Sequence, residues 1–355
     1  MTLIIKHKSI LTILILAIFL ISACAPQPAV DEPRVLRVMS HDSFAISEDV
    51  IAQFEDEHGV SVSFIRSGDT GTALNQAILT KENPIADVFF GVDNTFLTRA
   101  LDEEIFVAYD SPMLDEIPDE FKIDPNNFAL PVDYGDVCIN YDKAYFEEHD
   151  LPIPASLEDL TDPMYEGLLV AQNPATSSPG LAFMMATIAH FGEADFLNYW
   201  EALADNGLVV VSNWETAYYT NFSGSTGEGP QPLVVSYGSS PAAEVIFAEV
   251  ELEEAPTGSI IGPNTCFRQI EFVGVLRNAN NPDLAELFID FMLSVPFQED
   301  IPLQMFVFPV NPNAELPQAF IEHVDTPDEP ATLPPEQIDA NREQWIDAWL
   351  DTVLN

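Results

Sequence analysis

Three short polar stretches of the sequence carry side chains suited to holding a small ligand. G-D-T-G places the carboxylate of Asp69 beside the hydroxyl of Thr70, although an aspartate in such a turn can simply cap its own backbone. T-S-S-P-G places Ser177 and Ser178 before an expected helix, where hydroxyls and free backbone N–H groups bind an anion or a hydroxyl, or only cap the helix. Trp214 offers one N–H donor and a ring face that attracts cations, unless it packs in the core.

The motifs of well-known catalytic sites are absent from the sequence. There is no Walker loop, no G-x-G-x-x-G, no H-E-x-x-H and no G-x-S-x-G nucleophile elbow, and the 6 histidines are scattered. With 58 acidic residues, some carboxylates fall close together by chance, so paired acids do not indicate a hydrolase. We therefore expect a binding protein without catalytic residues, a metal or a cofactor. An enzyme, such as a hydrolase at the cell surface, is the alternative.

Composition limits the class of partner. The chain has 355 residues, 47% of them hydrophobic, which is enough for one large or two medium folded domains. It carries 12 Lys and Arg against 58 Asp and Glu, a formal charge of −46. Such a polyanion is not expected to bind nucleic acid through the phosphates, but it can attract cationic ligands. A surface adapted for solubility or salt explains the same charge.

The first 23 residues have the pattern of an export signal. MTLIIKHK carries Lys6 and Lys8, and the uncharged run SILTILILAIFLISA is shorter than the ~20 apolar residues of a membrane span. Its ending, I-S-A-C, resembles the bacterial lipobox, which implies cleavage before Cys24 and a lipid on its sulfur. An uncleaved anchor helix is the alternative. We expect a lipoprotein signal peptide at 1–23, a Pro-rich tether at 24–33, and export to the outer face of the cell membrane or the periplasm.

The remaining chain alternates between strand and helix patterns. A helix is expected after Ser47, with Val50, Ile51 and Phe54 on its apolar face and Gly59 at its end, and G-D-T-G is expected to be a turn. This alternation predicts a parallel sheet with helices on both faces. Expected strands cover 35–39, 60–64, 85–92, 168–171, 208–211, 233–236 and 267–276. Further helices are expected at 72–81, 94–101, 179–191, 282–293 and from Pro334, the last with Ile338, Trp345 and Trp349 on one face.

Several stretches, in this order along the chain, resemble one known family. They are MSHDSFAISEDVIAQFEDEHGVSV, ADVFFGVDNTFL, LPVDYGDVCINYDK, QNPATSSPGLAF, SNWETAYYTNF, VVSYGSSPA, and the tail IPLQMFVFPV with PPEQIDANREQWIDAW. Together they resemble the thiamine-binding proteins that serve ABC importers, within the periplasmic binding proteins that also include iron(III) binders. The resemblance covers residues from about 35 to 350.

The resemblance implies an α/β fold of type II, in which two lobes are joined by two crossing hinge strands and close on the ligand. Lobe one would comprise 34–133 and 268–310, and lobe two 138–262, with a C-terminal helical segment at 311–355. It also implies a monomer that delivers a small molecule to an ABC permease in the membrane.

The resemblance also implies a set of ligand-binding residues and some departures from the family pattern. Thiamine binders have an aromatic residue where this chain has His41, another where it has Ala243, and a Trp where it has Phe306. Tyr218 and Tyr219 are placed to replace part of this aromatic cage. The ligand is therefore expected to be thiamine, a thiamine phosphate, a pyrimidine precursor or another small cation. The implied ligand-binding residues are His41, Asp69, Thr70, Ser177, Ser178, Trp214, Tyr237, Gly238, Ser239 and Ser240.

Two other ligand classes remain open at this point. Iron(III) binders of the same group use a His, a carboxylate and two consecutive tyrosines, because hard Fe(III) prefers phenolate and carboxylate oxygens. This chain offers His41 and the pair Tyr218-Tyr219, but the iron family's pair would fall at Tyr237, which Gly238 follows. Polyamines are the second class, since an acidic cleft suits them.

Cys138 and Cys266 lie on the two implied crossing strands, in D-V-C-I-N and T-C-F-R-Q. If these strands lie side by side, a disulfide across the hinge is feasible in an oxidising compartment. Two buried free thiols are the alternative.

Overall fold

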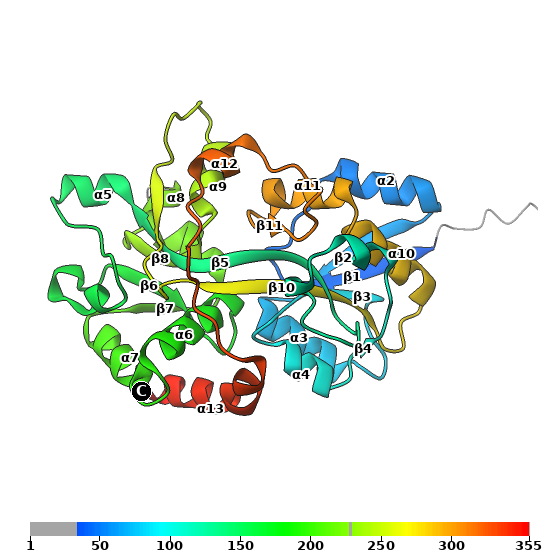
Figure 1. The fold of residues 1–355 in the computed structure, drawn as a ribbon, viewed down its shortest axis with the longest axis horizontal. Helices are drawn as coiled ribbons and strands as arrows, with labels where there is room; N and C mark the ends of the chain where they lie inside the picture. The colour runs from blue at the N-terminus through cyan, green and yellow to red at the C-terminus, as the bar shows by residue number, and fades with distance from the viewer. Residues whose placement is uncertain (1–33, 227–228, 355) are drawn as a thin grey trace, which may run out of the picture. The chain divides into compact units, whose positions relative to one another are not determined.

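The computed structural model describes residues 34–226 and 229–354. The expected signal peptide, Cys24 and the tether up to residue 33 therefore lie outside the described residues. Figure 1 follows the described chain from β1 to the C-terminal helix α13. Among the described helices, none has both the length and the apolar character needed to cross a membrane.

The first part of the sheet is built from β1 (Val35–Ser40), β2 (Ser61–Arg66) and β3 (Val88–Asp93). β1 pairs in parallel with β2 on one side and with β3 on the other, as the alternating pattern predicted. The helix α2 (Glu48–His58) follows Ser47 and ends at Gly59, whose φ of 63° is the left-handed conformation that glycine adopts easily. This helix agrees with its sequence prediction at both ends.

The helices after β2 and β3 begin at different places from those expected. The helix α3 (Thr70–Leu79) begins two residues early, because Asp69 accepts a hydrogen bond from the Thr70 N–H and so caps the helix rather than closing a separate turn. The helix α4 (Leu97–Asp102) begins three residues late. There Asp93 accepts hydrogen bonds from the backbone N–H groups after it and holds a turn.

The second part of the sheet consists of β6 (Leu169–Gln172), β7 (Val209–Val211) and β8 (Leu233–Tyr237). β6 pairs in parallel with β7 and with β8. Between β6 and β7 the chain forms α6 (Ser178–Phe191), as predicted, and α7 (Phe196–Asp205), which the sequence analysis did not anticipate.

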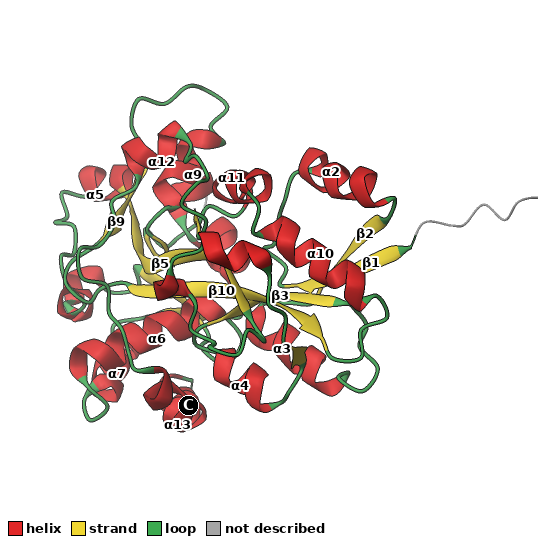
Figure 2. Cartoon of the chain, turned by 45° about the vertical axis from the view of Figure 1, so that its right-hand side comes forward, coloured by secondary structure: helices red, strands yellow, loops and turns green. Residues whose placement is uncertain are grey.

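Two long strands join these two parts. β5 (Leu130–Asp142) and β10 (Phe267–Leu276) pair with each other in antiparallel fashion, and the strand order is β2-β1-β3-β10-β5-β8-β6-β7. Figure 2 shows both strands running through the middle of the molecule. The parallel pairing that the alternation predicted is present in two groups at the ends of the sheet. The antiparallel strands β5 and β10, which correspond to the crossing strands that the resemblance implied, connect them.

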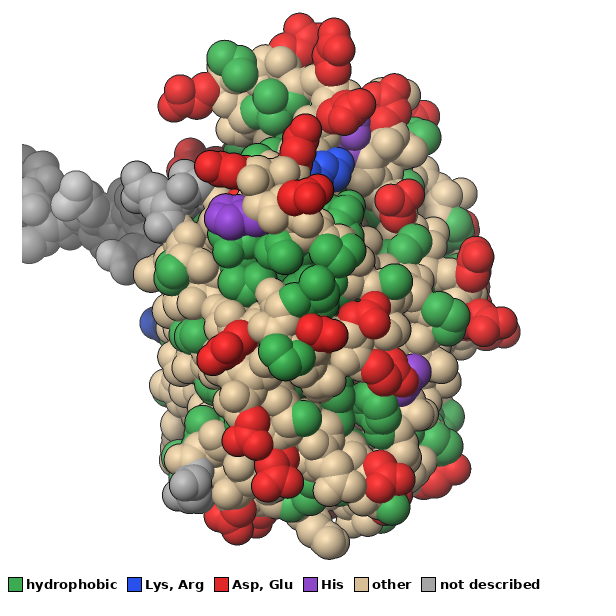
Figure 3. All heavy atoms as spheres, turned by 90° about the vertical axis from the view of Figure 1, so that its left-hand side faces the viewer, with side chains coloured by type: hydrophobic (Ala, Val, Ile, Leu, Met, Phe, Trp, Pro, Cys, Tyr) green, Lys and Arg blue, Asp and Glu red, His purple; other side chains and the backbone are tan. Residues whose placement is uncertain are grey.

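The remaining strands and helices complete the fold. They are β4 (Phe106–Val107), β9 (Thr257–Ile260), β11 (Phe308–Pro309), α5 (Lys143–Glu148), α8 (Ser223–Thr226), α9 (Ser240–Ile246), α10 (Pro282–Met292), α11 (Val295–Gln304), α12 (Gln318–His323), the 3₁₀ helices Pro112–Glu116, Asp119–Phe121, Glu158–Thr161 and Pro163–Tyr165, and a π-helical turn, η6 (Thr216–Asn221). Acidic side chains are scattered over the face drawn in Figure 3, with few basic ones among them.

The C-terminal helix α13 (Pro335–Val353) packs against α7. As predicted, Ile338, Trp345 and Trp349 are buried on one face. The Trp349 ring meets the Trp200 ring of α7 edge-to-face, with centroids 5.2 Å apart. These aromatic contacts hold the end of the chain against the part of the sheet that contains β6 and β7.

Candidate ligand-binding pocket

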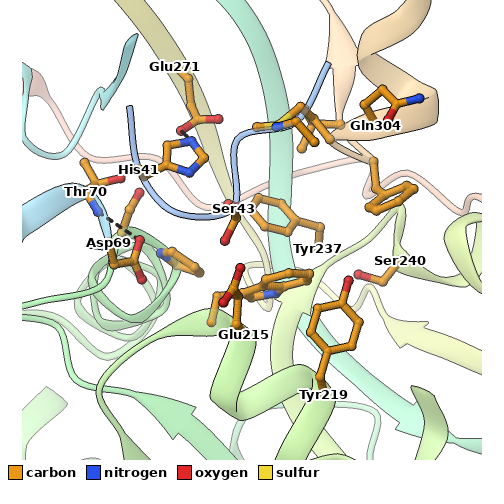
Figure 4. Close-up of a pocket in the computed structure, with 17 residues that line it drawn as sticks. His41, Ser43, Asp69, Thr70, Glu215, Tyr219, Tyr237, Ser240, Glu271 and Gln304 are labelled. Carbon is orange, nitrogen blue, oxygen red and sulfur yellow. Dashed lines mark hydrogen bonds and ion pairs between the residues drawn. The ribbon is translucent and has the colours of Figure 1, made fainter. Parts of the chain in front are cut away.

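A cavity of about 180 Å³ lies where loops from both parts of the sheet meet. Figure 4 shows its side chains converging from the loop after β1, the start of α3, the turn before η6, the end of β8, strand β10 and the end of α11. The lining residues are His41, Ser43, Ala45, Asp69, Thr70, Ser178, Pro179, Trp214, Glu215, Tyr219, Tyr237, Ser240, Glu271, Gln304, Met305, Phe306 and Val307. Neither Lys nor Arg is among them.

Most of the residues expected at the site line this cavity. They are His41, Asp69, Thr70, Ser178, Trp214, Tyr237 and Ser240. Ser177, Gly238 and Ser239 do not line it. Ser239 donates its hydroxyl to the Phe306 carbonyl oxygen, and the Gly238 N–H donates to the Asp136 carbonyl oxygen, so both support the wall from behind.

Asp69 places a buried carboxylate at the cavity wall. Its Oδ1 accepts from the Thr70 N–H, while Oδ2 is buried and makes no hydrogen bond in the described chain, although Ser177 and the Trp214 backbone lie close enough to favour its charge. Burial raises the pKa of Asp69 despite these neighbours and His41. A buried carboxylate oxygen without a partner is costly, so it favours a ligand that donates a hydrogen bond or carries positive charge.

His41 is not free to contact a ligand alone, because it pairs with Glu271. The two side chains lie 3.2 Å apart, from Nε2 to Oε1, and both point to the cavity (Figure 4). Burial lowers the pKa of His41, but attraction to Glu271, with smaller contributions from Asp69 and Asp42, prevails and raises it. Gly91 makes room for this arrangement, since a Cβ at that position would collide with the imidazole ring.

Behind this pair, Asp133 of β5 is a second buried carboxyl group. Burial raises its pKa strongly, and the neighbouring charge of Glu271 raises it further. Two neighbouring carboxyl groups do not both ionise readily, so the protonated form of Asp133 is favoured, while Glu271 pairs with His41. Of the three acidic residues that line the cavity, Asp69 and Glu215 are not paired with His41.

Aromatic rings form the opposite wall. Trp214 stacks on Tyr218, with ring centroids 5.0 Å apart and planes 16° apart, and donates its Nε1–H to the Ser236 hydroxyl at 2.9 Å. Tyr219 stands edge-on to Trp214 at 5.4 Å and is 49% exposed. Phe306 lines the cavity as well. Ring faces beside carboxylates form an environment that attracts an organic cation.

Tyr237 is fixed by contacts on two sides. Its hydroxyl donates to Gln269 Oε1 at 2.9 Å, and a Cβ added to Gly135 of β5 would lie 2.7 Å from its ring. Gly135 belongs to the D-Y-G stretch of the sequence, and its missing side chain is what lets the Tyr237 ring lie against β5.

Ser178 lines the cavity, but its hydroxyl is already engaged. It donates to Asp93 at the end of β3, and the Gln269 side-chain amide bonds to the same carboxylate. Burial raises the pKa of Asp93, and the bonds from Ser178 and Thr95 oppose that shift. Ser178 therefore connects the start of α6 to β3 in addition to lining the cavity, where the resemblance implied a contact with the ligand.

The sequence analysis missed several lining residues, mainly Ser43, Glu215, Glu271, Gln304 and Met305. For one of them, Glu271, the sequence contains a pattern that indicates a site. Gln269 and Glu271 are buried polar residues at alternate positions of β10, on the face opposite Arg268, and polar side chains on one face of a buried strand often mark a site. The others lie in loops or at a helix end, where no periodic pattern reports orientation.

The geometry offers little to iron(III). Within the described residues, no group of three or more His, Cys, Asp or Glu side chains could hold a metal ion. The Tyr218 hydroxyl donates to Glu244 at 2.7 Å, the Tyr237 hydroxyl is bonded to Gln269, and His41 is paired with Glu271. The side chains that an iron site would need are thus already hydrogen-bonded or ion-paired to other side chains of the protein.

Cys138 and Cys266 form a disulfide in the structure, with Cα atoms 4.3 Å apart. Cys138 lies within β5, and Cys266 immediately precedes β10. The bond ties the two crossing strands together behind the cavity.

Comparisons with known proteins agree with this architecture. The model of a family described as bacterial extracellular solute-binding protein matches residues 83–325. A thiamine-binding periplasmic protein of Salmonella typhimurium strain LT2 is 30% identical over 337 residues, covering 93% of this chain and 96% of the relative. That of Brucella suis biovar 1 strain 1330 is 29% identical over 349 residues, covering 96% of this chain and 98% of the relative.

Solved structures extend the likeness to three dimensions. A periplasmic thiamin binding protein superposes with a TM-score of 0.79 at 28% identity, covering 90% of this chain and 96% of the other. A ferric binding protein from Campylobacter jejuni, at 18% identity, superposes with a TM-score of 0.72 over 89% of this chain and 99% of its own, and shares the fold alone. The predicted fold class is confirmed, and the chain belongs to the bacterial extracellular solute-binding proteins, with their two-lobed type II fold.

Proposed function

We propose that this protein captures thiamine, or a thiamine phosphate or precursor, outside the cytoplasm and delivers it to an ABC importer. One observation carries the proposal. The cavity combines the carboxylates of Asp69 and Glu215 with the rings of Trp214, Tyr219 and Phe306, and no Lys or Arg lines it. Thiamine is a flat, permanently cationic molecule with an amino group, so it matches both the charge and the ring faces.

The departures from the thiamine-binder pattern are compatible with this ligand. Glu271 neutralises the charge of His41, so a histidine at that position does not repel a cation. Tyr219 adds a ring to the wall, compensating for the small side chain of Ala243, and Phe306 keeps an aromatic face at its own position. Relatives named for thiamine binding at 29–30% identity support the same ligand.

The lobe boundaries form part of the proposal. Lobe one comprises 34–133 and 268–310 and contains β2, β1 and β3. Lobe two comprises 138–262 and contains β8, β6 and β7, while 311–355 packs on the outside. This division is supported by the strand order, because among the described strands β5 and β10 lie between the two parallel groups. Bending at these two strands would open and close the cavity, as in hinge closure around a ligand.

We further propose that the signal peptide is removed and that lipid on Cys24 anchors the monomeric protein near its permease. The I-S-A-C sequence supports this. Cys24→Ser should release the protein from the membrane fraction into the soluble extracytoplasmic fraction, with ligand binding unchanged. A variant that stays in the membrane fraction would mean that the apolar segment itself is the anchor.

Isothermal titration of thiamine into the exported protein, purified in detergent, tests the ligand. Thiamine phosphate, the free pyrimidine, spermidine, and iron(III) with phosphate serve as parallel titrants. We expect submicromolar thiamine binding and none for iron(III). Absence of thiamine binding together with a response to spermidine would replace the proposed ligand with a polyamine and leave the transport role intact.

A further inference from the structure

A second and larger cavity, of about 680 Å³, shares a wall with the ligand pocket. Trp214, Tyr219, Ser240 and Phe306 line both cavities. The second cavity then continues along α9 (Ser240–Ile246) and the loop after it. The two cavities are therefore neighbours, and a ligand arm that passes these shared residues would enter the second one.

The size of this second cavity depends on a small residue. Ala243 lines it and is itself buried, at 8% exposed. Its methyl group leaves open the space that a tyrosine or tryptophan would occupy at the same point of α9. This position thus decides whether the second cavity is available to a ligand.

The chemistry of the second cavity selects positive charge. Glu244 lines it beside Ala243 and, within the described chain, accepts one hydrogen bond, from the Tyr218 hydroxyl at 2.7 Å. Glu249 lines it too, whereas no Lys, Arg or His does. Its carboxylates and ring faces together would bind an ammonium group and repel a phosphate.

Phe247 adds a reason to expect an occupant. Its ring is 61% exposed, yet it meets the Phe306 ring edge-to-face with centroids 5.1 Å apart. The two rings come from segments far apart in the sequence and meet at the rim of the second cavity. Apolar surface on the rim of a cavity is covered when a ligand chain passes beneath it.

We propose that the second cavity is a binding compartment for a positively charged arm of the ligand. The natural ligand is then an elongated cation, with a heteroaromatic ring in the first pocket and an ammonium group beside Glu244. This inference rests on the proposed function only for the ring end of the ligand.

The ionisation of Glu244 provides a specific readout. Burial raises its pKa to about 7, against the opposing effect of the Tyr218 hydrogen bond. The other ionisable groups around it are Tyr219, Glu215 and Glu249. An ammonium group beside Glu244 would favour the carboxylate, so binding near neutral pH releases about half a proton.

The test compares thiamine with two extended probes in the exported protein purified in detergent. One probe carries an aminoalkyl chain ending in a primary ammonium, and the other carries a chain of equal length ending in a hydroxyl. Two such pairs are made, because either end of thiamine can face the second cavity. In one pair the chain is attached to the hydroxyethyl oxygen of thiamine, and in the other to its pyrimidine 2-methyl group. Titrations in buffers of different ionisation enthalpy report the proton released.

We expect the ammonium-tipped probe of one pair to bind about tenfold more tightly than its hydroxyl-tipped partner, with proton release. Glu244→Gln should remove both the preference and the proton release. Glu253→Gln, an exposed carboxylate of the same loop that does not line the cavity, is the matched control and should change neither. Ala243→Trp should weaken both extended probes at least tenfold while thiamine binding stays at or above wild type.

Equal affinities for ammonium-tipped and hydroxyl-tipped probes in both pairs would overturn the proposal. So would equal weakening of thiamine and the extended probes by Ala243→Trp. If thiamine alone fails to bind but the ammonium-tipped probe binds and depends on Glu244, the proposed ligand fails while the second compartment stands. If no probe binds, both fail.

Discussion

His41 and Glu271 form an ion pair beside the ligand pocket, with Nε2 and Oε1 3.2 Å apart and both side chains 8% exposed. Burial lowers the pKa of His41, but Glu271 outweighs it and raises the pKa above the usual 6.5. A raised pKa means that the protonated histidine stabilises the folded chain. This stabilisation is fully present below the unfolded-state pKa and is lost as the pH rises through the folded-state pKa.

We therefore expect His41→Gln to cost more stability at about pH 5.5 than at about pH 9, by about 1 kcal/mol. Urea unfolding of both proteins at both pH values measures the difference. In a Glu271→Gln background this pH dependence should disappear or reverse, because burial, which lowers the pKa of His41, is then opposed only by the smaller contributions of Asp69 and Asp42. A cost independent of pH would show that the pair does not hold a proton on His41.

Asp69→Asn separates ligand binding from folding. Asparagine caps a helix as well as aspartate does, so α3 is retained and the free energy of unfolding should change by less than ~0.5 kcal/mol. Thiamine binding should weaken about tenfold or more, because the buried Oδ2 loses its charge. Titration calorimetry measures the affinity. The exposed Glu82→Gln, which does not line the pocket, is the matched control and should leave it unchanged.

Gly135→Ala tests how Tyr237 is positioned. The new methyl group would lie 2.7 Å from the Tyr237 ring and push it into the cavity, so thiamine affinity should fall several-fold. Gly258→Ala is a matched control, since its Cβ would lie 2.5 Å from the Tyr141 ring, which does not line the pocket. Both variants should lose stability, but only the first should lose affinity. If Gly135→Ala binds thiamine as tightly as the wild type, the Tyr237 ring does not contact the ligand.

Cys138 and Cys266 join positions 128 residues apart in the sequence, so their disulfide strongly restricts the unfolded chain. We expect the double variant Cys138→Ala, Cys266→Ala to lose about 2–5 kcal/mol of stability. Thiol titration of the unfolded, non-reduced wild type should find neither cysteine reactive. Two reactive thiols, or an unchanged unfolding midpoint in the double variant, would contradict the disulfide in the exported protein.

Local signals in the sequence were sufficient for many elements. Gly59 ends α2 because glycine adopts the left-handed conformation easily, whereas Ser47 precedes the helix without a side-chain capping bond. The strand 267–276 was predicted at both ends, since its second half is an apolar, β-branched run that ends at a turn. The helix α7 was not predicted, and the antiparallel pairing of β5 with β10 could not be read from either strand alone, because strand direction depends on which neighbours pair.

The sequence by itself determined much of the secondary-structure alternation and the acidic charge, and its resemblance to a known family pointed to Asp69, Trp214 and Tyr237 as candidate ligand-binding residues. Only the tertiary structure decided which side chains meet. It pairs His41 with Glu271, places the Ser178 hydroxyl in a hydrogen bond to Asp93, and leaves a second cavity beside Ala243. These contacts join residues far apart in the chain, and their partners are set by how the strands pair across the sheet, which no local pattern encodes.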